Sequence, residues 1–98
     1  MLHSIEIRQT EIYERWFAKL RDENARAKIL VRIRRLSLGN MGDVKAVGGG
    51  VSELRIDHGP GYRVYFTKRG KALVLLLCGG DKKTQSSDIE KAMALAKE

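Results

Sequence analysis

The sequence predicts an α+β fold in which an antiparallel-type sheet packs against a helical hairpin and a C-terminal helix. Between residues 10 and 39, apolar side chains recur at helical spacing, whereas segments between residues 44 and 77 alternate or run apolar over strand lengths. The predicted order is one strand, two helices, three or four strands and a last helix. Because 98 residues suffice for only one core, we expect a single domain spanning residues 1–98.

The first part of the chain is predicted to form a short strand and two helices. Residues 4–8 alternate apolar and polar side chains, which is a strand pattern. Thr10 is the expected N-cap of the first helix, and the apolar pattern around Trp16 favours core packing over base stacking. The second helix is expected to begin near Asp22 and to end at Gly39. The two helices should form a hairpin.

The second part of the chain is predicted to be mainly β. Strand patterns occupy residues 44–47, 51–56, 62–66 and 73–77. The triple glycine at 48–50 favours a hairpin connection, because it lacks the Lys-Ser/Thr end of a Walker loop and the spacing of a dinucleotide fingerprint. The run 73–77 is apolar on both faces, as is typical of a central strand. A capping box of Ser87 and Glu90 predicts the start of the last helix.

Composition limits the possible partners. The chain has 19 Lys plus Arg against 12 Asp plus Glu, a formal net charge of +7, which favours a polyanionic partner. The longest apolar run, 72–78, is too short to span a membrane, and residues 1–6 do not resemble a secretory signal. We therefore expect a cytoplasmic protein with no membrane partner. Cys78 with His3 and His58 forms no recognisable metal-ligand pattern, so we expect no metal and no cofactor.

A polar face on two neighbouring strands is the main candidate site. In the segments 51–56 and 62–66, alternation places Glu53, Arg55, Arg63 and Tyr65 on one side and apolar residues on the other. A carboxylate, two guanidinium groups and a phenol on a rigid sheet could bind a phosphate and transfer a proton. Ordinary cross-strand ion pairing between Glu53 and an arginine is the alternative.

Two lysines could complete this site. Lys82 and Lys83 follow Gly79 and Gly80, where the chain leaves the apolar strand, and functional groups often follow strand ends. If one of them reaches the face that carries Arg63, the groups needed to cut RNA without a metal would be present together.

The chain resembles a known protein family along nearly its whole length. The most specific matching motifs are Gly61-Tyr62-Arg63-Val64 and Gly79-Gly80-Asp81-Lys82. Together with Trp16, Asp22 and Gly50, they resemble the addiction-module killer proteins, HigB-like members of the RelE/ParE toxin superfamily in bacterial type II toxin–antitoxin systems. The family's order of elements matches the order predicted above.

This resemblance implies a toxin that cleaves mRNA, often on the ribosome, and that a helix-turn-helix antitoxin encoded beside it neutralises. In such enzymes the ribose 2′-OH attacks the adjacent phosphate and produces a 2′,3′-cyclic phosphate and a 5′-OH. Arg63 matches the phosphate-stabilising arginine, Glu53 the position of a base, and Arg55 a neighbouring basic position.

The resemblance also suggests a proton donor and further RNA contacts. Lys82 or Lys83 matches a late basic or histidine position and is the candidate acid. Because the C-terminal tyrosine or histidine of some relatives is missing, Tyr65 could partly substitute. The candidate RNA-binding residues are Lys45, Lys68, Arg69, Arg32 and Arg35. The arginines of the second helix fit a solvated surface equally well.

Two other functions stay open at this point. ParE-type toxins of the same superfamily bind DNA gyrase and cleave nothing, and a noncatalytic RNA-binding protein would also be basic. The nuclease interpretation depends on geometry: Glu53, Arg55 and Arg63 must project from one accessible surface toward a single phosphodiester.

Overall fold

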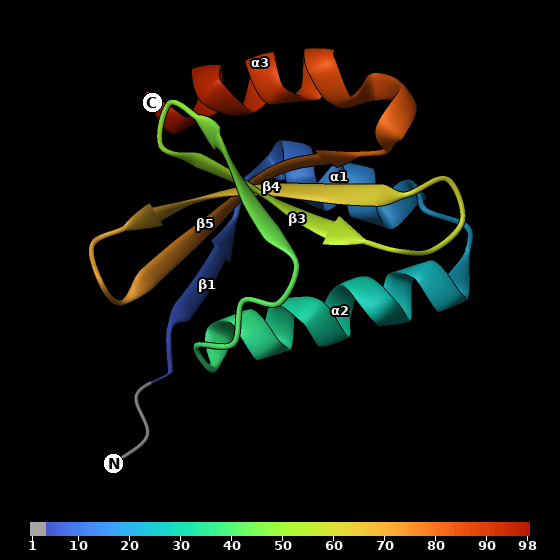
Figure 1. Ribbon diagram of the computed structural model, residues 1–98, viewed down its shortest axis with the longest axis horizontal. Coiled ribbons are helices and arrows are strands. Elements are labelled where there is room, and N and C mark those ends of the chain that lie inside the picture. The colour runs from blue at the N-terminus through green and yellow to red at the C-terminus, as the bar shows by residue number, and fades with distance from the viewer. Residues whose placement is uncertain (1–3) are drawn as a thin grey trace.

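A five-stranded sheet with the strand order β1-β5-β4-β3-β2 forms the middle layer of the protein (Figure 1). The computed structural model describes residues 4–98, so the predictions about the first three residues, including His3, lie outside it. The elements are β1 (Glu6–Gln9), α1 (Glu11–Lys19), α2 (Glu23–Ser37), β2 (Val44–Gly48), β3 (Val51–Ile56), β4 (Tyr62–Arg69), β5 (Leu73–Gly80), the 3₁₀ turn η1 (Lys82–Thr84) and α3 (Gln85–Ala96). The α+β class and the order of elements are confirmed.

The sheet is mixed rather than wholly antiparallel. Strand β1 pairs with β5 in parallel, whereas the three pairings from β2 to β5 are antiparallel. The helices that follow β1 carry the chain away before the remaining strands form, so no hairpin forces an antiparallel pairing at this edge. The apolar run 73–77 lies within β5, between two other strands, as predicted for a central strand.

The register of β3 and β4 confirms that the polar residues share a face. Glu53 lies opposite Tyr65, and Arg55 lies opposite Arg63. Residues directly opposite each other in an antiparallel pair project to the same side of the sheet. The alternation along the sequence therefore identified the face correctly.

Helices α1 and α2 cover one face of the sheet, and α3 covers the other (Figure 1). The first face is closed by Tyr13 of α1 and by the predicted stripe of α2, in which Ile29 and Leu36 are buried. Helix α1 rests mainly on β5 and α2 on β3, so the predicted hairpin consists of two helices on different strands rather than of one closely packed pair. The face of the sheet that carries Glu53 and Tyr65 also holds a second apolar core, which lies under α3.

The glycines of the β2–β3 connection form a tight turn. Gly49 and Gly50 join the strands with φ of +62° and +78°. Type I′ hairpin turns, whose twist matches that of the strands, require positive φ at both central positions, which glycine adopts without a steric penalty. The predicted hairpin connection is confirmed.

The last helix begins earlier than its predicted cap. Helix α3 starts at Gln85, directly after η1, and the capping box is formed by Asp81 and Thr84 rather than by Ser87 and Glu90. The Asp81 carboxylate accepts a hydrogen bond from the Lys83 backbone N–H at 2.8 Å. Because this cap turns the chain at the strand exit, the Ser87 hydroxyl lies inside the helix and donates to the Thr84 carbonyl oxygen.

Cys78 is a buried apolar residue of this fold. Its side chain is 1% exposed within the core under α3, and burial raises the pKa of its thiol to about 11. Within residues 4–98, no three His, Cys, Asp or Glu side chains lie close enough together to hold a metal ion. In the same part of the chain, no helix combines the length and the apolar character needed to cross a bilayer.

Two glycines let helices approach β5 closely. A Cβ atom on Gly79 would lie 2.3 Å from Cε3 of Trp16, and a Cβ atom on Gly80 would lie 1.8 Å from Oδ2 of Asp88. The indole of α1 and the first turns of α3 therefore pack against bare backbone. A side chain at either position would push the helix away from the sheet.

We expect Gly79→Ala to destabilise the protein by about 1–3 kcal/mol, because the added methyl group overpacks against the Trp16 ring. The cost should shrink in a Trp16→Leu background, where the clashing ring atoms are absent. Urea unfolding of the wild type, both single variants and the double variant measures this coupling. Equal costs of Gly79→Ala in both backgrounds would contradict the close approach.

Candidate active site

A polar depression of about 580 Å³ lies where β3 ends and β4 begins. It is lined by Asp43, Arg55, Ile56, Asp57, Gly59, Pro60, Gly61, Arg63 and Lys82. The three cations among these residues come from β3, β4 and η1. A concave site with convergent cations on sheet ends suits a phosphate group.

Arg63 is anchored from behind by a buried carboxylate. The residue is 7% exposed, and its Nε lies 3.7 Å from Oε1 of Glu53. Both atoms are buried and neither has a hydrogen-bond partner. Because unpaired charges are costly in the protein interior, the attraction between these two groups fixes the inner part of the guanidinium. Among the described residues, the one hydrogen-bond acceptor of this guanidinium is the Tyr62 carbonyl oxygen, 3.4 Å from Nη1.

Glu53 is held by side chains from two other elements. It is fully buried, and its Oε2 accepts hydrogen bonds from the Tyr65 hydroxyl at 3.0 Å and from Nε2 of Gln85 at 2.7 Å. Gln85 is the first residue of α3, so the start of this helix seals Glu53 from solvent. The expectation of an accessible polar surface is therefore wrong for Glu53, which cannot touch a substrate in this conformation.

Tyr65 is also removed from the surface. It is completely buried, and its hydroxyl donates to Glu53 rather than pointing into the depression. Burial, reinforced by the adjacent Glu53 carboxylate, raises the pKa of the phenol well above its ordinary value. The phenol thus stays protonated and serves as a donor to Glu53.

Arg55 is the more accessible arginine of the site. Its Nε and Nη2 donate to Oδ1 of Asp43 at 3.2 and 3.1 Å, which fixes the guanidinium at the rim of the depression. The side chain remains 39% exposed, so it can also face a ligand. Asp43 thereby orients Arg55 in the way that Glu53 orients Arg63.

Of the two candidate lysines, Lys82 reaches the depression. A Cβ atom on Gly61 would lie 3.1 Å from Cγ and Cε of Lys82, which shows that the lysine side chain runs across this glycine. Lys83 is exposed on η1 and does not line the depression. The sequence did not distinguish the two lysines as candidates. In the structure, the 3₁₀ turn places Lys82 at the depression and directs Lys83 away from its lining.

The rim of the depression is tied to the start of α2. Nε2 of His58, in the loop after β3, lies 3.0 Å from Oδ2 of Asp22, the N-cap of that helix. The pKa of the Asp22 carboxyl is lowered, first by the hydrogen bond from the Ala25 N–H and then by His58. His58 therefore fastens the loop that forms one wall of the site.

The five candidate RNA-binding residues do not form one surface. Lys45 is exposed on β2 opposite Glu53, whereas Arg32 donates to the backbone carbonyls of Arg55, Met41 and Asp43. Arg35 lies on α2 beside a different hollow. Lys68 and Arg69 are at the far end of β4, about 20 Å along the strand from Arg63. Arg32 thus fastens the loop before β2 to β3.

Three residues of the site were not identified from the sequence as functional. Gln85 contacts Glu53 across 32 positions, and no local pattern indicates such a contact. Asp43 and Asp57 belong to loops or strand ends, where the position of a carboxylate follows from the folded chain alone. Their position at strand ends was the one feature of the sequence that could have indicated a functional role.

These features define a small α+β protein with a RelE-like fold and a cationic depression at one end of its sheet. Residues 15–98 match the family described as phage-derived protein Gp49-like (DUF891), and the chain belongs to this family of toxin-like proteins from toxin–antitoxin modules. A similar protein, from Haemophilus influenzae, is described as an uncharacterized protein. It is 52% identical over 95 residues, which cover 97% of this chain and 96% of the relative.

We expect Gln85→Leu to lower the free energy of unfolding by about 1–3 kcal/mol, because the buried Glu53 carboxylate loses a donor at 2.7 Å. The control is Ser86→Leu, which introduces the same leucine at an exposed neighbour in the same helical turn. Its effect should stay within about 0.5 kcal/mol. Chemical denaturation measures both variants, and equal stabilities would show that Gln85 does not support Glu53.

Proposed function

We propose that the protein is the toxin of a type II toxin–antitoxin module and cleaves mRNA without a metal ion, with the depression as its active site. The observation that carries this proposal is the fixed Arg63, whose Nε lies 3.7 Å from the buried Glu53 while Arg55 and Lys82 line the same depression. A preorganised cation costs no rearrangement when charge develops on a phosphate, and this is the main requirement of the reaction.

The reaction begins with attack of a ribose 2′-OH on the adjacent phosphorus. A bond forms between the 2′-oxygen and phosphorus, the bond to the 5′-oxygen of the next nucleotide breaks, and the products are a 2′,3′-cyclic phosphate and a 5′-OH. Negative charge accumulates on the phosphate oxygens in the transition state. Arg63, Arg55 and Lys82, which line the depression from three different elements, stabilise this charge.

Two proton transfers complete the reaction. Because Glu53 is buried and cannot contact the substrate, it cannot accept the 2′ proton directly. The exposed Asp57 lines the depression and has no ion-pair partner among residues 4–98, so we assign it the role of base. The ammonium group of Lys82 donates a proton to the leaving 5′-oxygen. In this scheme Glu53 and Tyr65 position Arg63 and transfer no proton.

The finer biological role belongs to the same proposal. The motifs around Arg63 and Lys82 support a HigB-like toxin that acts on mRNA at the ribosome and arrests translation in the cytoplasm. The net charge of +7 suits a substrate embedded in ribosomal RNA. A helix-turn-helix antitoxin encoded by the adjacent gene is the expected partner.

A gyrase-binding toxin is the second candidate. The burial of Glu53 and Tyr65 favours it, because two of the residues with acid–base chemistry are unavailable to a substrate. A toxin of this kind would inhibit DNA supercoiling and would leave RNA intact.

We expect Arg63→Ala, Arg55→Ala and Lys82→Ala each to reduce RNA cleavage by about 100-fold or more, because each removes a group that stabilises the transition state. Lys83→Ala is the matched control, since this adjacent lysine lies outside the depression, and it should change the rate by less than about 2-fold. Purified variants are compared on a synthetic RNA in the presence of EDTA, and the product ends are mapped as 2′,3′-cyclic phosphate and 5′-OH.

Three results would contradict this assignment. If Lys82→Ala and Lys83→Ala reduced the rate of RNA cleavage equally, the depression would have no specific role in the reaction. Cleavage that EDTA abolishes would require a metal. Intact RNA together with inhibited DNA supercoiling would establish the gyrase-binding alternative.

A further inference from the structure

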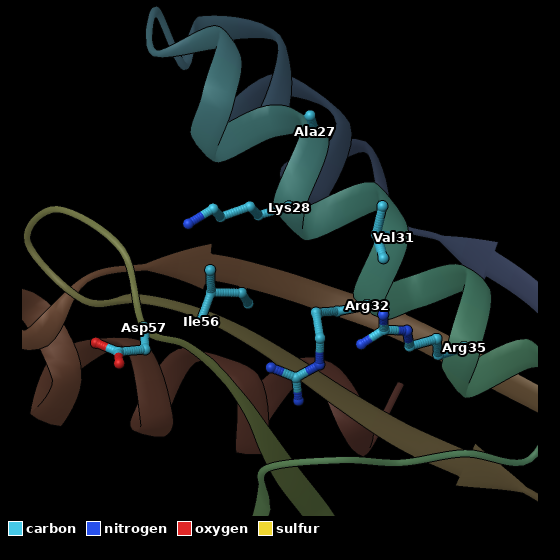
Figure 2. Close-up of a pocket in the computed structure, with 7 residues that line it drawn as sticks. All are labelled: Ala27, Lys28, Val31, Arg32, Arg35, Ile56 and Asp57. Carbon is cyan, nitrogen blue, oxygen red and sulfur yellow. The ribbon is translucent and has the colours of Figure 1, made fainter.

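A mostly apolar groove of about 340 Å³ lies between α2 and the end of β3 (Figure 2). Its lining residues are Ala27, Lys28, Val31, Arg32, Arg35, Ile56 and Asp57. In Figure 2, the side chain of Arg32 points from α2 toward the strands, where it binds backbone carbonyls. Val31 and Ile56 give the groove its apolar character from opposite sides.

Helix α2 and its C-cap carry the exposed large apolar side chains of the described residues. The large apolar side chains that are exposed in residues 4–98 are Leu30, Val31 and Leu38, at 54%, 47% and 61%. Leu30 and Val31 belong to α2, and Leu38 is its C-cap. Val31 is the one of these three that lines the groove, and its exposed side chain adds to the apolar surface of the lining, whereas Leu30 projects about 100° away around the helix.

The charges around the groove specify the partner further. Lys28 and Arg35 line the groove and Arg34 is exposed on the same helix, and none of them forms an ion pair within residues 4–98. Asp57 is the one carboxylate of the lining and lies at the end nearest the active-site depression. A complementary segment therefore carries apolar side chains toward Val31 and carboxylates toward the cations of α2.

The groove and the active-site depression share a wall. Ile56 and Asp57 line both hollows. A chain segment seated in the groove would consequently lie beside the cations that are proposed to hold the phosphate. Occupancy of the groove and entry of RNA into the depression are therefore expected to compete.

We propose that this groove is the docking site of an acidic amphipathic segment of the antitoxin, and that the docked segment obstructs the depression. The inference rests on the proposed function for the identity of the partner. A protein segment suits the groove better than RNA, because the lining contains no aromatic ring for base stacking and one of its three cations, Arg32, is already bound to backbone.

The test compares Val31→Asp with Leu30→Asp in the full-length protein. Consecutive helical residues point about 100° apart, so the same change affects the groove at Val31 and misses it at Leu30, which is similarly exposed. Isothermal titration with the antitoxin encoded by the adjacent gene should give a Kd at least 10-fold higher for Val31→Asp. The Kd of Leu30→Asp should stay within 2-fold of the wild type.

A charge variant and a competition experiment complete the test. Lys28→Glu should also weaken antitoxin binding, and the loss should diminish as salt screens the interaction. RNA cleavage by Val31→Asp should match the wild type when the toxin is alone and should resist inhibition by added antitoxin. Thermal unfolding of each variant verifies that the fold is kept.

The outcomes separate this inference from the proposed function. Equal effects at Val31 and Leu30, no effect at either, or no complex with the adjacent protein would overturn the docking site. Unchanged antitoxin affinity with weakened RNA binding in Val31→Asp would assign the groove to RNA. If the wild type cuts no RNA but Val31→Asp still loses the antitoxin, the nuclease proposal fails and the docking site stands.

Discussion

The buried ion pair between Glu53 and Arg63 is the constraint on which the candidate site depends. A carboxylate with no solvent exposure is tolerable only if cationic and polar groups surround it, and here Arg63, Tyr65 and Gln85 do so. The pair therefore requires β3, β4 and α3 to be in place together. In return it fixes a guanidinium at the edge of a depression without using a substrate-facing group as the anchor.

The close packing of α3 on β5 links the core of the protein to this site. Gly80 leaves room for Asp88, whose carboxylate accepts a hydrogen bond from Thr84 at the start of the helix. The same segment carries Lys82 over Gly61 and Gln85 over Glu53. The segment formed by η1 and α3 thus closes a core and also supplies two parts of the active site, so stability and activity are coupled where α3 begins.

The period-two pattern of β3 and β4 was enough to predict which polar residues share a face, because strand geometry fixes alternation locally. The pattern could not predict how deeply each of these side chains is buried. Glu53 and Arg55 are two residues apart on the same face, yet Gln85 covers the first and leaves the second at the rim. The choice between Lys82 and Lys83 depended on a 3₁₀ turn capped by Asp81, which has no helical or strand periodicity to reveal it.

The most direct measurement is the ¹H–¹⁵N NMR signal of the Arg63 Nε–H group. The structure predicts that this proton exchanges slowly with solvent, because Nε is buried against Glu53, and that Glu53→Gln shifts and accelerates it. The signal should persist when an RNA with a 2′-deoxy group at the cleavage site binds, while the outer guanidinium nitrogens shift. The buried ion pair would be contradicted if the Arg63 Nε–H proton exchanged as fast as the Nε–H protons of the exposed Arg34 and Arg35, and if Glu53→Gln did not change its exchange rate.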